Sequence, residues 1–299
     1  MCGADLPRAL PGHHQADGLA GAEFIRHTAG MAIIDIHAHA FPDALAARAM
    51  AALEDPLEWK AIGDGTIADL TRSMDAAGID TVVICNIATK PSQVEPIFGW
   101  CKQVASPRII PFPSIHPETP DVGSWLRRFV EAGLRGVKMH PMYQDFAIDD
   151  AKMDRVYEPL AQMGLPLMLH CGYDIAFPGD RRADVDRIVR VTERHPSLQL
   201  ICTHLGGWKQ WQAVREQLCG RNVWLETSMS IGLLGLEGTR QIIREHGPER
   251  MLFGSDWPWS HQTEQLNLLR SLDLPKEQLD AILHGNAARL LALGSKVSG

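Results

Sequence analysis

The sequence predicts an α/β protein, and specifically a single-domain (β/α)8 barrel of the TIM type. Eight short apolar runs, each of the length of a buried strand, alternate with segments of helical periodicity. The connections between successive runs are long enough for the crossovers that parallel strands need. The chain has 299 residues, of which 45% are hydrophobic, and this is sufficient for the core of one such barrel.

Each predicted strand is followed by a predicted helix. The strands are expected at 32–39, 81–85, 109–115, 135–139, 166–170, 198–204, 223–227 and 251–256. The helices are expected near 67–77, 92–105, 122–132, 150–163, 183–194, 208–218, 242–246, 262–272 and 276–293, with a partly helical piece at 44–53. Gly78, Gly133 and Gly164 stand where helices commonly end. The alternative is an open doubly wound sheet, but no glycine-rich phosphate loop follows the first strand, so no dinucleotide cofactor is expected.

Composition and charge narrow the possible partners. The net charge of -7 and the pI near 6.0 argue against a nucleic-acid or membrane-surface role. No apolar run is long enough to span a bilayer. The six cysteines include no CxxC pair and several lie in strand-like runs, which indicates reduced thiols in a cytoplasmic protein. We expect a small-molecule substrate, and self-association into a homo-oligomer stays open.

Residues 1–30 differ from the rest of the chain. They show no periodicity and lack the continuous apolar core of a signal peptide. Met31 stands directly before the first predicted strand. We therefore expect a loosely ordered extension at 1–30 and a barrel domain with C-terminal helices at 31–299.

Two histidines end the first predicted strand. In an extended strand alternate residues share a face, so His37 and His39 should project side by side, with Asp35 in the same phase. Ile34, Ile36 and Ala38 would then face the helices. Two converging imidazoles make half of a metal site, and two buried, hydrogen-bonded histidines are the equally open alternative.

Other polar residues also end predicted strands. Lys138, His170, His204 and Asp256 each close an apolar run and precede a loop. Catalytic and binding residues of this barrel type lie at the carboxyl ends of the strands. We therefore expect all of these side chains at one rim of the barrel. Histidine and aspartate are ligands of divalent metals and above all of zinc. His140, in phase with Lys138, is expected to hydrogen-bond a residue of the site rather than to act directly.

These motifs resemble the amidohydrolase superfamily, and within it the amidohydrolase-related branch that includes aminocarboxymuconate semialdehyde decarboxylase-like proteins. The resemblance covers about 31–293 and rests on His37-Ala38-His39, Leu169-His170-Cys171-Gly172, Thr203-His204-Leu205-Gly206-Gly207, Gly254-Ser255-Asp256-Trp257-Pro258 and the closing segment 284–291. It implies that His37, His39, His170 and Asp256 hold the metal. It implies that His204 is an acid/base group or a second-metal ligand. Lys138 would either bind substrate or, once carboxylated, bridge two metals.

The expected function follows from this set of residues. With His204 and Asp256 as the catalytic groups, water activated by a divalent metal, which we expect to be Zn²⁺, would hydrolyse a small carboxylated amide, ester or lactone. The alternative is a carboxy-lyase, which would remove CO₂ from an unsaturated or aromatic acid without oxidation. A metal-binding barrel without turnover is a second alternative. One metal with an unmodified Lys138 is favoured over two metals.

Overall fold

The computed structural model describes residues 32–54 and 59–293 of the chain. The expected extension 1–30 lies outside these residues, so it stays a prediction. The strands are β1 Ile34–Ala38, β2 Thr81–Cys85, β3 Ile109–Phe112, β4 Val137–Met139, β5 Leu167–Leu169, β6 Leu200–Cys202, β7 Trp224–Glu226 and β8 Met251–Leu252. All of their pairings are parallel, in the orders β1-β2-β3 and β4-β5-β6-β7-β8.

Backbone hydrogen bonds join the two runs of strands into a closed barrel. Between β3 and β4, Lys138 N donates to the carbonyl of Pro113 over 2.9 Å. Between β8 and β1, Ile36 N donates to Phe253 over 2.9 Å, and Asp256 N donates to His37 over 2.7 Å. The predicted (β/α)8 barrel is therefore confirmed, with its first and last strands joined along one seam.

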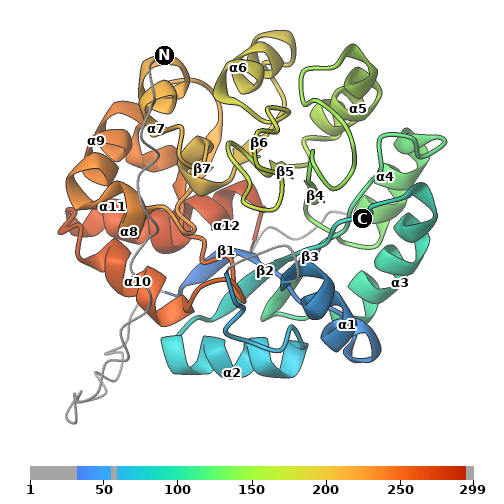
Figure 1. Ribbon diagram of the computed structural model, residues 1–299, viewed down its shortest axis with the longest axis horizontal. Helices are drawn as coiled ribbons and strands as arrows, with labels where there is room; N and C mark the ends of the chain where they lie inside the picture. Colours follow the sequence, from blue (N-terminus) through green and yellow to red (C-terminus); the bar gives the residue numbers. More distant parts are fainter. Residues whose placement is uncertain (1–31, 55–58, 294–299) are drawn as a thin grey trace, which may run out of the picture. The chain divides into compact units, whose positions relative to one another are not determined.

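Helices surround the strands, as Figure 1 shows. They are α1 Asp43–Glu54, α2 Ile67–Ala77, α3 Val94–Val104, α4 Val122–Glu131, α5 Asp154–Met163, α6 Val185–Arg194, α7 Trp211–Ala213, α8 Ile231–Leu234, α9 Leu236–His246, α10 Gln262–Arg270, α11 Lys276–Asp280 and α12 Asn286–Leu290. Two predicted helices, 208–218 and 276–293, are interrupted by π-helical turns at Val214–Leu218 and Ala281–Gly285. Within the described residues, no helix combines the length and apolar character that crossing a bilayer requires.

Two apolar cores lie on the two sides of the strands. The inner cluster takes Ile34, Val83, Phe112, Met168 and further residues from seven of the strands, together with α12. Only the barrel interior is common to so many strands, so this cluster fills the barrel. The larger cluster lies between the strands and the surrounding helices. Catalytic side chains therefore have room only beyond the filled interior, at the ends of the strands.

One prediction about β1 is wrong. Ile34 and Ile36 belong to the inner cluster instead of facing the helices. Asp35 does not share the face of the histidines, because its carboxylate accepts hydrogen bonds from Ser255 Oγ at 2.6 Å and Gln262 Nε2 at 2.8 Å. The cause is a register shift between Asp35 and Ala38 in the pairing with β2. Such an irregularity breaks strict alternation, so the residues after it change face.

A buried histidine far from the pocket makes the stability of this fold depend on pH. His246 Nε2 donates to the carbonyl of Val223 over 3.1 Å, and its Nδ1 accepts from Gly220 N over 3.3 Å. Burial lowers the pKa of His246 from 6.5 to about 4. Its stabilising contribution is therefore complete above pH 6.5 and is lost as the pH falls toward 4.

We expect His246→Gln to flatten this dependence. Glutamine keeps a donor for Val223 but does not titrate. Between pH 8 and pH 5 the wild-type protein should lose roughly 2 kcal/mol more unfolding free energy than the variant. At pH 5 His246 takes up a proton on unfolding, whereas glutamine at this position takes up none. Urea unfolding of both proteins at the two pH values measures the difference. An equal loss in both proteins would show that His246 does not carry the dependence.

Candidate metal and active site

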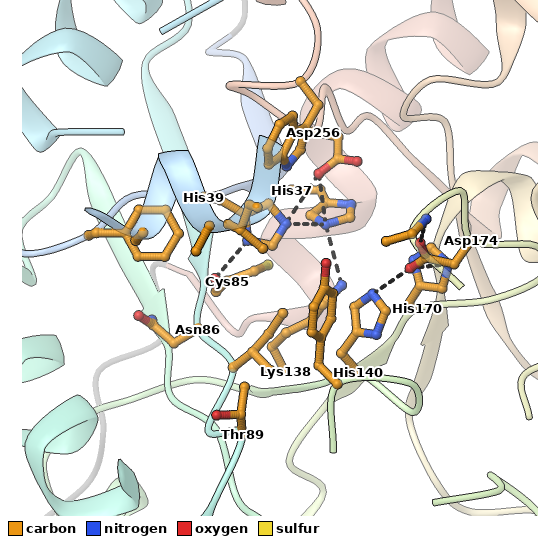
Figure 2. A pocket seen from close by; sticks show the side chains of 18 of the residues that line it. His37, His39, Cys85, Asn86, Thr89, Lys138, His140, His170, Asp174 and Asp256 are labelled. Atoms are coloured by element: carbon orange, nitrogen blue, oxygen red, sulfur yellow. Dashed lines mark hydrogen bonds and ion pairs between the residues drawn. The ribbon is translucent and has the colours of Figure 1, made fainter. Parts of the chain in front are cut away.

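A cavity of about 710 Å³ opens at the carboxyl ends of the strands. Its floor carries residues that lie in or just after β1, β4, β5 and β8, namely His37, His39, Lys138, His140, His170 and Asp256 (Figure 2). His204, just after β6, lines the same cavity. The site residues predicted from the sequence thus line one pocket, at the rim where this fold places its chemistry. Much of the remaining wall is apolar or aromatic.

Three of these residues form a triangle of ligand atoms. His37 Nε2 lies 3.2 Å from His39 Nε2 and 3.4 Å from Asp256 Oδ1, and His39 Nε2 lies 3.2 Å from the same oxygen. Two ligands bound at about 2.0–2.1 Å to a tetrahedral ion are separated by about 3.3 Å. The triangle therefore has the dimensions of one face of a metal coordination sphere. We call His37, His39 and Asp256 the ligand triangle.

Hydrogen bonds at the far side of each ring determine which nitrogen faces the triangle. His37 Nδ1 lies 3.1 Å from Glu226 Oε1, and His39 Nδ1 lies 2.9 Å from the carbonyl oxygen of Cys85. Both partners are acceptors, so each Nδ1 carries the proton and each Nε2 keeps its lone pair. Burial and then Lys138 lower the pKa of His37 well below its ordinary value, so this imidazole is neutral. Neutral rings with a free Nε2 are the form that ligates metals.

The triangle brings together three groups that can only accept. Asp256 Oδ1 is buried and has no hydrogen-bond partner among the described residues. Burial alone would raise the pKa of Asp256, but His37 and His39 outweigh burial and hold this pKa well below its usual range. Three converging lone-pair donors repel one another unless a cation lies between them. The residues present therefore fit a divalent metal.

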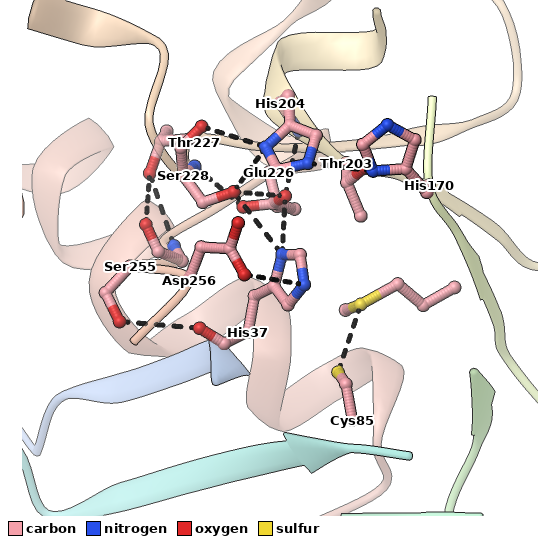
Figure 3. A network of polar contacts seen from close by, with 12 residues as sticks. His37, Cys85, His170, Thr203, His204, Glu226, Thr227, Ser228, Ser255 and Asp256 are labelled. Atoms are coloured by element: carbon pink, nitrogen blue, oxygen red, sulfur yellow. Dashed lines mark hydrogen bonds and ion pairs between the residues drawn. The ribbon is translucent and has the colours of Figure 1, made fainter. Parts of the chain in front are cut away.

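Glu226 was not recognised from the sequence, and its carboxylate contacts His37 of the ligand triangle (Figure 3). Its carboxylate is fully buried at the end of β7. This carboxylate accepts a hydrogen bond from His37 Nδ1. It also accepts hydrogen bonds from Ser228 Oγ and from the backbone amide of His204, both over 2.8 Å. Its position at the end of a predicted strand was a signal of the same kind as for the other residues.

Ser228 links Glu226 to His204 through two hydrogen bonds of its hydroxyl group. Because its hydroxyl proton goes to Glu226, Ser228 Oγ accepts from His204 Nδ1 over 2.9 Å. His204 Nε2 is left unprotonated and lies 3.3 Å from His170 Nδ1. Burial, followed by His170, lowers the pKa of His204 to about 3. His204 is thus a neutral, oriented imidazole with a free nitrogen at the pocket.

The structure places His170 apart from the triangle. Its Nδ1 faces His204, and its Nε2 lies 3.4 Å from the carbonyl of Tyr173 and 3.7 Å from Asp174 Oδ2. Burial, followed by His140, lowers its pKa to about 3. The geometry thus brings three of the four expected ligands together, and the expected role of His170 stays a prediction.

Asp174 joins His140 and His170 in a second cluster that the sequence analysis did not identify. Asp174 Oδ2 lies 3.2 Å from His140 Nε2. The two imidazoles stack with centroids 4.3 Å apart and planes only 18° from parallel. An ion lies in the plane of each imidazole that ligates it, and two stacked rings have no common point nearby. This cluster therefore suits a carboxylate shared by two rings better than a second metal.

Lys138 is the buried cation of the pocket. Its side chain is 1% exposed, and Nζ lies 3.3 Å from His37 Nε2. The described residues provide no carboxylate within ion-pair distance of Nζ. A buried ammonium without an anionic partner is costly, so an anion beside the ligand triangle would stabilise it.

Comparison with protein families agrees with these features. The family model described as amidohydrolase matches residues 34–293, which is most of the chain. The comparison with curated proteins found no match to this chain.

Several solved structures share the fold. An uncharacterized TIM-barrel protein from Bordetella bronchiseptica is 21% identical, with a TM-score of 0.69 over 88% of this chain and 99% of its own. The 5-carboxyvanillate decarboxylase of Sphingomonas paucimobilis is 18% identical, with a TM-score of 0.66 over 88% of this chain and 99% of its own. A dihydroxybenzoic acid decarboxylase from Polaromonas sp. JS666, solved with manganese and 2-nitroresorcinol, is 17% identical, with a TM-score of 0.69 over 89% of this chain and 98% of its own.

Proposed function

Because the chain belongs to the amidohydrolase family, we propose that it is a metal-dependent carboxy-lyase that removes CO₂ from a small unsaturated or aromatic acid. The sequence led us to expect hydrolysis first. Several structures of the same fold are decarboxylases, and they favour the alternative hypothesis of a carboxy-lyase. The Lys138 ammonium and the aromatic wall of the pocket support the same hypothesis. Hydrolysis of an ester or lactone is the competing outcome in the test below.

The observation that carries the proposal is the position of Lys138. Its ammonium lies beside the ligand triangle, 3.3 Å from His37 Nε2, and has no ion pair with a carboxylate of the described residues, so it can serve as a counter-ion for a substrate carboxylate. Tyr143, Trp208 and Trp259 are among the aromatic residues around it. An aromatic acid would place its carboxylate at the charged floor and its ring against this wall.

The net reaction replaces the bond between carbon and carboxylate with a carbon–hydrogen bond and releases CO₂. One proton must therefore reach the carbon. We assign this transfer to His204, whose oriented Nε2 can accept a proton from a substrate hydroxyl and return it to the carbon. Asp256 is the second group beside the substrate that can carry a proton. The divalent ion, when held by His37, His39 and Asp256 with His170 as the proposed fourth ligand, supplies Lewis-acid polarisation and an anchor for substrate oxygens.

The test compares the two reactions on one preparation. Full-length protein loaded separately with zinc and manganese is incubated with 2,6-dihydroxybenzoate, 5-carboxyvanillate and other hydroxybenzoates, and with a panel of esters and lactones. We expect CO₂ release from at least one acid. If an ester or lactone is hydrolysed and no acid releases CO₂, the proposal is wrong and the protein is a hydrolase. Bound metal without either activity would favour the binding protein without turnover.

Glu226→Gln should weaken metal binding without unfolding the barrel. Glutamine keeps the shape of the side chain but removes the charge that holds the proton on His37 Nδ1. Loss of such a partner typically costs 10–100-fold in metal affinity. Competition with a chromogenic chelator measures the affinity. Unchanged affinity would show that Glu226 is only a packing residue. Glu237→Gln, on the exposed side of α9, is the control.

Lys138→Met should raise KM for the acid substrate more than tenfold, because the variant loses a charge-assisted contact with the carboxylate. We propose one metal per chain, so metal content should stay the same and bicarbonate should not affect wild-type activity. Metal analysis and kinetics with and without bicarbonate test this. A fall from two metals to one in the variant would instead show a carboxylated Lys138 that bridges two ions.

A further inference from the structure

The outer part of the pocket is larger and more apolar than a single-ring acid requires. A cavity of about 150 Å³ is enough to hold benzene. The pocket here has about 710 Å³, so a benzoate at the charged floor would leave most of it unfilled. The walls of this outer part come mainly from α1 and α3.

Helix α1 presents an apolar stripe to the cavity. Leu45, Ala49, Ala52 and Leu53 all line the pocket, and their spacing places them on one face of the helix. A different pair, Ala46 and Met50, is buried and anchors α1 to the barrel. Leu45 is 43% exposed. None of these four residues is buried among the described residues, so the stripe leaves apolar surface open to the cavity.

Helix α3 supplies the facing wall. Pro96, Ile97 and Trp100 line the same pocket at helical spacing. Trp59 and Trp259 also line the pocket. A 2.8 Å hydrogen bond from Trp59 Nε1 to the carbonyl of Trp259 joins them.

The charge of these walls also suits an acid. The helices α1 and α3 contribute no carboxylate to the pocket lining, and their one charged residue there is Arg48. An anion can therefore pass these walls without repulsion and reach Lys138. Apart from Arg48, the side chains that α1 and α3 present to the pocket are apolar and suit an apolar group.

We propose that the substrate is an acid with an apolar extension, of the size of a second aromatic ring or a short alkyl chain, that lies between α1 and α3. This inference rests on the proposed function, because it takes the ligand triangle and Lys138 as the place of the carboxylate. Leu45, Ala49, Ile97 and Trp100 would then determine which acids bind.

Two probe acids that differ only by a fused ring test the proposal. Salicylate and 3-hydroxy-2-naphthoate share the same carboxylate and hydroxyl, and the second ring of the latter points away from both. Isothermal titration of the metal-loaded full-length protein should show at least tenfold tighter binding of the naphthoate, equivalent to about 1.4 kcal/mol. Equal affinities would overturn the inference and leave the proposed function in place. If neither acid binds, both fail.

Substitutions on α1 locate the binding of the extension. Ala49→Trp fills the space beside the stripe, so it should remove the advantage of the naphthoate and leave the affinity for salicylate within twofold. Ala51→Trp is the matched control, because Ala51 is exposed on α1 and does not line the pocket. Leu45→Asp, at a half-exposed position, should also weaken the naphthoate selectively and covers the case in which Ala49→Trp does not fold. An equal effect of Ala51→Trp, or none from the two pocket variants, would contradict the proposal.

Discussion

Removal of the metal is expected to lower turnover by roughly 10³-fold or more, because a Lewis acid contributes several kcal/mol to stabilising the transition state. The ligand triangle has the dimensions of a coordination face, and Asp256 Oδ1 has no partner other than the cation that the site would hold. The barrel should stay folded after chelation, because the core that forms it does not involve the triangle.

The experiment treats the protein with a chelator, measures residual metal by elemental analysis, and follows activity and far-ultraviolet circular dichroism. Reloading with zinc or manganese should restore turnover, and the more effective ion identifies the metal, for which the ligand set favours zinc. Two solved structures of the same fold contain manganese, so both ions must be compared. Full activity of protein shown to be free of metal would exclude the proposed chemistry.

His204→Asn is expected to lower turnover by about 10²–10⁴, the range for loss of a general acid or base. Asparagine can keep the hydrogen bond to Ser228, but it cannot carry a proton between substrate atoms. Metal content should stay the same, because the triangle does not include His204. Elemental analysis beside steady-state kinetics separates the two roles.

The outcome that would contradict this assignment is loss of half the metal together with the activity, which would make His204 a ligand of a second ion. Ser228→Ala provides a graded comparison. It leaves the imidazole in place but removes the acceptor that holds its proton on Nδ1. Its turnover should fall between those of the wild-type protein and His204→Asn, with unchanged metal.

The fold was predictable because its signals are local. Strand and helix periodicities alternate along the chain, and strand ends indicate the rim. The register shift in β1 was not predictable, because alternation in the sequence does not reveal an irregular pairing with β2. The prediction for Asp35 failed for this reason.

The candidate site was predictable in its residues more than in its geometry. His204 follows the end of β6 by two residues and Asp256 follows the end of β8 by four, and their φ angles are 58° and 66°. These left-handed conformations aim the two side chains, and no periodic pattern marks them. Asp174 lies in a loop, and its contact with His140 depends on how two loops fold over one another. Only tertiary structure determines such pairs.

The seam between β1 and β8 also affects how the protein is made. His37 and Asp256 are 219 positions apart, and at 5–20 residues per second the ribosome needs roughly 10–40 s to synthesise the segment between them. During that time β1 can pair with β2, but its other edge has no partner. The emerging chain thus carries an exposed strand edge, and His37 lacks its partners Glu226 and Asp256, until the last strands arrive. An unpaired strand edge of this kind can pair with another chain, so this seam is where we expect incomplete chains to associate.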